Sequence, residues 1–88
     1  MPKFFFDIWD HNAFVPDPDG ADLPDLAEVR KQAASDAREI LSDGRANGED
    51  RGGWIFDIKD GESRTVLRSR LSDLLREEGG ASSTTRAA

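Results

Sequence analysis

The sequence predicts an α+β domain in the order β-β-α-β-β, with a mainly antiparallel sheet of about four strands packed on one long helix. Two similar segments, residues 5–10 and 55–60, lie fifty positions apart. Each alternates large apolar residues with other types and then reaches an Asp and turn-forming residues, which is typical of a strand that enters a hairpin. Between them lies one long segment with apolar residues at helical spacing. These observations together define the fold class.

The first hairpin is predicted over residues 3–15. Side chains alternate between the two faces of a strand, so residues 3–9 divide into an apolar face and a mixed face, namely Phe4, Phe6 and Ile8 against Phe5, Asp7 and Trp9. Residues 10–12, Asp-His-Asn, suit a tight turn because Asp and Asn bond their own backbone. Residues 13–15 then return as a short strand, and we interpret the sole histidine, His11, as a turn residue.

The long helix is predicted to begin near Asp25, after a turn that contains an Asp-Gly pair. Pro24 keeps the residue before it out of the helical region, and Asp25 with Glu28 has the form of a capping box. One apolar stripe follows, formed by Leu26, Val29, Ala33, Ala37, Ile40 and Leu41. The helix is expected to end at Gly44 or Gly48.

The second hairpin follows a polar, glycine-rich loop at residues 47–53. Alternate residues before and along its first strand are expected to face the helix, namely Trp54, Phe56 and Ile58. Asp60-Gly61 indicates a type I′ turn, because this pair readily adopts the positive φ values that such a turn needs. Residues 64–68 are then expected to pair back across it.

A short C-terminal helix is predicted to begin at Ser72, with Leu71, Leu74 and Leu75 against the core. From Gly79 onward the sequence has no apolar periodicity and is rich in small polar residues. We therefore predict one domain at residues 1–78 and a flexible, disordered tail at residues 79–88.

Composition limits the classes of function. The chain has 88 residues, no cysteine and a net charge of −6. An acidic chain lacks the basic field that nonspecific binding to nucleic acid or anionic membranes requires, and no segment has the roughly 20 apolar residues of a transmembrane helix. The N-terminal residues reach Asp7 too early for a secretory signal, so a cytoplasmic location is the default. Positive charge gathers locally, since residues 64–76 hold four Arg against Asp73.

The mixed sheet face is the most informative candidate for function. It would carry Phe5, Trp9 and Ile55 beside Asp7 and Asp57, and such aromatic residues are favoured at the centres of protein contacts. Two interpretations are open. Either the leucines of residues 71–75 fold over this face as a second small core, or the face binds a protein partner or a second copy of the chain.

Carboxylates suggest two further hypotheses. Asp17, Asp19, Asp22 and Asp25 surround Gly20 and invite a calcium site, but their spacing does not match a helix-loop-helix calcium loop, which would place Val15 and Leu26 at ligand positions. Asp7 and Asp57 occupy matching places in the two similar strands, where a coupled pair would suit acid-base chemistry. No nucleophile or cofactor loop accompanies them, so we assign no catalytic, metal or cofactor-binding residue.

These segments together resemble a bacterial family of small uncharacterised proteins, the domain of unknown function numbered six eight nine four. The resemblance covers about residues 2–76 and is carried by Phe5-Phe6-Asp7, Asp19-Gly20, Leu23-Pro24-Asp25-Leu26 with the helix through Leu41, and the strand from Ile55 to Asp60. It implies the fold order and a bacterial cytoplasmic setting, and it brings no activity or ligand.

A similarity at the level of pattern points to HicB-type antitoxins, in which a hairpin with an Asp-Gly turn and a Pro-Asp-Leu segment precede an Ala-rich helix. That similarity implies a small toxin as partner. The chain departs from the pattern because residues 77–88 offer no DNA-binding element and the spacing from Gly20 to Pro24 is short.

We predict from these observations a non-catalytic protein-binding or regulatory module that acts through the mixed sheet face. The expected partner is another protein or a second copy, without nucleic acid, membrane or cofactor. The alternatives are a HicB-like partner of a toxin and a carboxylate-based metal or catalytic site.

Overall fold

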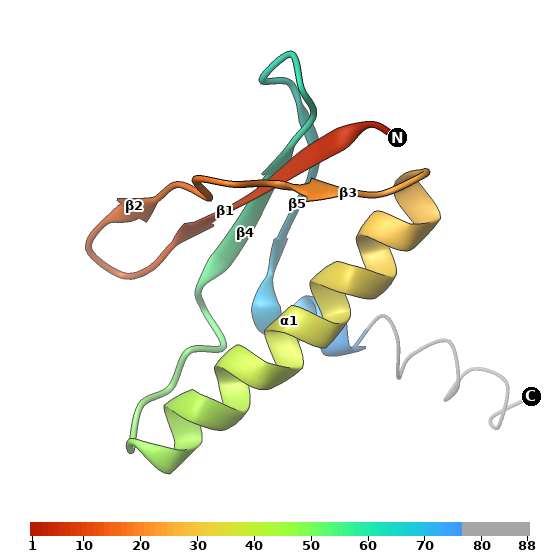
Figure 1. Cartoon of the computed structure of the whole chain (residues 1–88). Helices are drawn as coiled ribbons and strands as arrows, with labels where there is room; N and C mark the ends of the chain where they lie inside the picture. The colour runs from red at the N-terminus through yellow and green to blue at the C-terminus, as the bar shows by residue number, and fades with distance from the viewer. Residues whose placement is uncertain (77–88) are drawn as a thin grey trace, which may run out of the picture.

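The computed structural model describes residues 1–76 and has the α+β architecture (Figure 1). Its elements are β1 (Lys3–Trp9), β2 (Phe14–Val15), β3 (Ala21–Asp22), α1 (Leu26–Ala46), β4 (Ile55–Lys59) and β5 (Thr65–Arg70), followed by a helical segment at residues 71–76. The structure confirms the predicted order and adds β3. The predicted tail lies outside the described residues.

The sheet is antiparallel, with the strand order β2-β1-β4-β5, and β3 also pairs with β1. The two similar segments of the sequence are β1 and β4, which are direct neighbours with Asp7 opposite Asp57. The prediction of about four strands omitted β3. This strand pairs through two residues only, Ala21 and Asp22, which is too short for any alternating pattern in the sequence.

The core lies between α1 and one face of the sheet. It is made of the apolar faces that the sequence predicts, with Phe4 and Phe6 from β1, Phe56 and Ile58 from β4, and Val29, Ala33 and Ala37 from α1. Phe6 and Phe56 meet edge to face at 5.9 Å between ring centroids. Leu71 and Leu74, both fully buried, belong to this same core. The interpretation that residues 71–75 cover the opposite sheet face is therefore wrong.

The ends of α1 have well-defined caps. Asp25 is the N-cap, and its Oδ1 accepts a hydrogen bond from the Glu28 N–H at 2.9 Å. At the other end Gly48 has φ +74°, while its N–H donates to Arg45 O and the Glu49 N–H donates to Gly44 O. These two bonds form a Schellman motif, so Gly48 ends the helix, whereas Gly44 lies inside it.

Within residues 1–76, neither helical segment has the length and hydropathy needed to cross a membrane.

Candidate functional site

The sheet has a second face, opposite α1, that carries side chains from four strands. Paired residues share a face, so the register places together Phe5, Asp7, Trp9, Phe14, Ile55, Asp57, Lys59, Thr65, Arg68 and Arg70. Both α1 and the segment at residues 71–76 pack on the other side of the sheet (Figure 1). No helix within the described residues therefore covers the second face.

A buried carboxylate pair lies at the centre of this face. Asp7 and Asp57 are each only 6% exposed, although the sequence places them on an open face. Lys59 explains the difference, because its Nζ lies 2.8 Å from Asp7 Oδ2 and 3.5 Å from Asp57 Oδ2. The charge of this lysine compensates both carboxylates.

All four oxygens of the pair have partners. Asp7 Oδ1 accepts from the Asp17 N–H at 2.8 Å, and Asp57 Oδ1 accepts from Thr65 Oγ1 at 2.9 Å. Burial raises the pKa of Asp57, but the Thr65 hydroxyl and the charges of Lys59 and Arg68 outweigh it and hold the pKa below its ordinary value. The hydrogen bond to Asp7 in turn raises the pKa of Lys59. Each carboxylate of the pair is thus compensated by a cation and by hydrogen bonds.

Exposed apolar surface lies beside this pair. Trp9 and Phe14 are 41% and 38% exposed, and their ring centroids are 4.8 Å apart. Lys59 Nζ lies 5.0 Å from the centroid of Phe14, so one cation links the rings to the carboxylates. Sequence reasoning placed Trp9 here but missed Phe14, because the two-residue strand β2 gave no alternation from which to assign its face.

Phe5 and Ile55 contribute less exposed surface than the sequence suggested, since both are half-buried. The ring of Phe5 lies against Gly20, where an added Cβ would come within 3.0 Å of Phe5 Cε2. Gly20 also has φ +71°, so a side chain is disfavoured there on two counts. The exposed aromatic centre is thus the Trp9–Phe14 pair, which we call the aromatic patch.

The segment at residues 16–20 is attached to β1 by carboxylates rather than by strand pairing. Between β2 and β3 the Phe6 N–H has no strand partner, and Asp17 Oδ2 accepts its hydrogen bond at 3.1 Å. The other Asp17 oxygen accepts from the N–H groups of Asp19 and Gly20. Asp17 thus binds the backbone of β1 and Asp7 binds the backbone N–H of Asp17, an arrangement that we call the carboxylate clamp.

The carboxylates of the calcium hypothesis have different places in the fold, and Asp22 lies in β3. Asp17 is committed to backbone N–H groups and Asp25 caps α1. In residues 1–76 no group of three or more His, Cys, Asp or Glu side chains is arranged to hold a metal ion.

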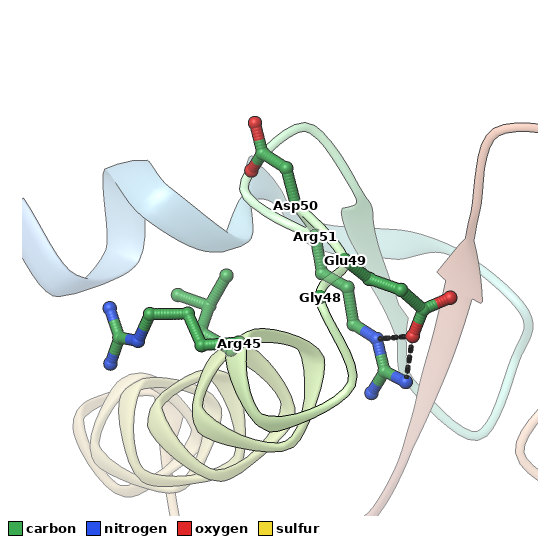
Figure 2. A pocket seen from close by; sticks show the side chains of 6 residues that line it. Arg45, Gly48, Glu49, Asp50 and Arg51 are labelled. Atoms are coloured by element: carbon green, nitrogen blue, oxygen red, sulfur yellow. Dashed lines mark hydrogen bonds and ion pairs between the residues drawn. The ribbon is translucent and has the colours of Figure 1, made fainter.

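A pocket at the C-terminal end of α1 is lined by Leu41, Arg45, Gly48, Glu49, Asp50 and Arg51. Figure 2 shows Arg51 directed at Glu49, with two hydrogen bonds to Oε1 at 3.1 and 2.6 Å, whereas Arg45 and Asp50 point away. Arg51 also donates to Ile40 O and lies over the ring of Trp54 at 4.9 Å. Its guanidinium is thus used to hold the loop on the helix end, and nothing about its geometry indicates a ligand.

An acidic groove lies between α1 and the β1 edge. Its rim carries Asp17, Asp36, Glu39 and Asp43, and its floor is apolar, with Phe6, Ile8, Ile40 and Phe56. Burial raises the pKa of Asp36, and the charges of Glu39 and Asp17 add to this effect although Gln32 donates to Asp36. The charged form of Asp36 is therefore unfavourable in this groove, first because of burial and then because of the neighbouring negative charges.

The chain is a small α+β domain whose described helices cover one face of the sheet only. Comparison with known proteins gives its family. The model named Domain of unknown function (DUF6894) matches residues 3–72, and the chain belongs to this family. No curated protein and no solved structure matches the chain. None of these comparisons finds a HicB-type antitoxin.

Proposed function

We propose that the domain is a non-catalytic protein-binding module whose second sheet face, centred on the aromatic patch, contacts another protein or a second copy of the chain. The observation that carries the proposal is the exposed Trp9–Phe14 pair, set on a rigid sheet beside the compensated Asp7–Lys59–Asp57 group. Aromatic side chains lose little entropy on contact and bury large areas, which suits the centre of an interface.

The carboxylates support a structural role in this face. Each oxygen of Asp7 and Asp57 has a partner, which supports a role for the pair in holding the side chains around it. A role as a HicB-like partner of a small toxin is one form of the same proposal, because it too needs only a protein-binding face.

The test compares two variants that each remove exposed apolar surface. The double substitution Trp9→Ser, Phe14→Ser removes the aromatic patch. Val15→Ser, Leu26→Ser removes two residues of similar exposure, 50% and 49%, of which Val15 follows Phe14 in β2 but lies on the other face of the sheet, paired with Ile8, and Leu26 lies at the start of α1. Solution mass by light scattering over a concentration series, followed by crosslinking in the native lysate, reports association. We expect the first variant alone to lose its partner while circular dichroism stays unchanged. Association that survives in the first variant would overturn the proposal.

A further inference from the structure

The two edges of the sheet differ in how their backbone hydrogen-bonding groups are satisfied. On the β1 side, β2 and β3 pair with the strand ends, and the carboxylate clamp satisfies the Phe6 N–H between them. On the β5 side, the described residues provide no further strand, since β5 pairs with β4 alone. Within residues 1–76 the backbone groups of one edge are therefore almost completely satisfied, and those of the other edge have no strand partner.

One hydrogen bond shows which residues of β5 direct their backbone groups at β4 and which direct them outward. Leu71 N–H donates to Trp54 O at 2.8 Å, so this pair is hydrogen-bonded, and such pairs alternate along an antiparallel ladder. With the observed register, Leu67 and Ser69 direct their backbone groups at β4, whereas Arg68 and Arg70 direct theirs outward. The same rule gives an outward Phe6 N–H on β1, where Asp17 is found.

The outward backbone groups belong to residues whose side chains are cationic. Arg68 and Arg70 lie on the second face and are 57% and 58% exposed. Arg68 lies 3.6 Å from the buried Asp57 and Arg70 lies 3.0 Å from Asp73, yet both arginine side chains stay more than half exposed and present positive charge beside the free edge. Residues 64–76 carry four Arg and one Asp in a chain whose net charge is −6.

We infer that β5 is a strand-addition site for an extended acidic segment of a partner protein. Each partner residue opposite Arg68 or Arg70 would exchange backbone hydrogen bonds with it and share its side of the sheet. Acidic residues at these alternate positions complement the arginines, and the residues between them lie on the side of Leu67. The same arginines disfavour pairing with β5 of a second copy, because like charges would then be placed together.

This inference is independent of the aromatic patch. Trp9 lies on β1, and β4 separates β1 from β5. A peptide on β5 therefore leaves Trp9 and Phe14 uncontacted, and the variant Trp9→Ser, Phe14→Ser is expected to bind it normally.

The probe is a capped hexapeptide of alternating Glu and Val, titrated into the full chain and followed by amide NMR and hydrogen exchange. We expect protection of the Arg68 and Arg70 amides, while Leu67 and Ser69 are protected by β4 from the start. Methylating the Glu amides, which face β5 in this register, should weaken binding about tenfold or more, since each removes a strand hydrogen bond. Methylating the Val amides, which face away, should leave it unchanged.

Two variants of the protein test whether the outward N–H of Arg68 takes part in binding. Arg68→Pro removes the outward N–H at an edge position, where Pro is tolerated, and Arg68→Thr removes the charge but keeps the N–H. We expect the Pro variant to bind more weakly than the Thr variant, and a Lys-Val peptide to bind more weakly than the Glu-Val peptide at low salt. Equal binding of the two methylated peptides, or no protection of Arg68 and Arg70 up to about 1 mM peptide, overturns the inference.

Discussion

At the scale of single residues, Lys59 decides the character of the second face. It is the cation that both central carboxylates share, and it also contacts Phe14. The sequence shows Asp7 and Asp57 at matching places and predicts that they lie together. It does not show that they are buried, because burial of the pair depends on a lysine whose partner is fifty-two positions away.

Replacing Lys59 by Met is expected to destabilise the fold in a pH-dependent way. Without the cation, two buried carboxylates oppose each other, and the folded-state pKa of one of them must rise. The cost, about 1–3 kcal/mol, is then present at neutral pH and disappears as falling pH protonates that group. Chemical denaturation at several pH values measures it. Lys59→Arg, which keeps the charge, should lose less, and a loss that is the same at every pH would contradict this account.

Asp36 presents the opposite case in the acidic groove. Burial raises the pKa of this carboxyl, so its charged form lowers stability above the folded-state pKa, and this cost ends as pH falls through it. Asp36→Asn keeps an oxygen for the Gln32 hydrogen bond and removes the charge. We expect a higher melting temperature than wild type at pH 7 and no difference at about pH 3, near the ordinary pKa of Asp.

Glu39→Gln is the companion to that variant, because Glu39 adds to the raised pKa of Asp36. It should raise the melting temperature at pH 7 by a smaller amount. A lower melting temperature for Asp36→Asn at pH 7 would show that the carboxylate has a stabilising partner instead.

At the scale of elements, the sequence was most informative where a backbone rule names particular residues. Asp25 and Gly48 cap α1 as capping rules predict. The type I′ turn predicted at Asp60-Gly61 is wrong, because the residue with positive φ in this turn is Ser63, at 66°, and Asp60 instead closes the hairpin by accepting from the N–H groups of Glu62 and Arg64. The sequence was least informative where a side chain substitutes for strand pairing. The carboxylate clamp gives no pattern at all, because Asp17 reads as one more turn residue in an acidic stretch.

At position 44 of α1, the side chain of Arg51 in the following loop leaves no room for any residue larger than glycine. An added Cβ would lie 2.8 Å from Cγ and Cδ of Arg51, so Ala at this position displaces the arginine from Glu49, Ile40 and Trp54. We expect Gly44→Ala to destabilise the wild type. In an Arg51→Ala background the same change should stabilise the fold by about 1 kcal/mol, the usual helix-propensity gain.

Free energies of unfolding for the four proteins of this cycle measure the coupling. Contacting residues commonly show interaction terms of about 0.5–3 kcal/mol. Additive effects of Gly44→Ala and Arg51→Ala would mean that the close approach has no influence on stability.

At the scale of the whole molecule, carboxylates determine the response to acid. The folded state lowers the pKa of Asp57 through Thr65, Lys59 and Arg68 against the opposing effect of burial, and backbone N–H groups lower the pKa of Asp60 and Asp10. Groups with depressed folded-state pKa values stabilise the fold above their unfolded pKa, and this stabilisation is lost as pH falls through the folded value. We therefore expect acid unfolding to begin below about pH 4, the ordinary pKa of Asp.

Circular dichroism during acid titration gives the midpoint for this transition. Asp60→Asn retains an oxygen for the Glu62 and Arg64 N–H groups but no titrating charge. The variant should be less stable than wild type at pH 7, and the difference in stability between the two proteins should become smaller as the pH falls. An acid midpoint that no substitution among Asp10, Asp57 and Asp60 alters would assign the transition to other groups.

The unequal edges of the sheet have a consequence for stoichiometry. Strand-mediated polymers grow because every added subunit presents a new free edge, and here the opposite side offers only the two-residue strands β2 and β3. If a partner strand joins β5 as inferred above, it finds no equivalent acceptor on the far side within residues 1–76, and such assembly would stop after a single addition.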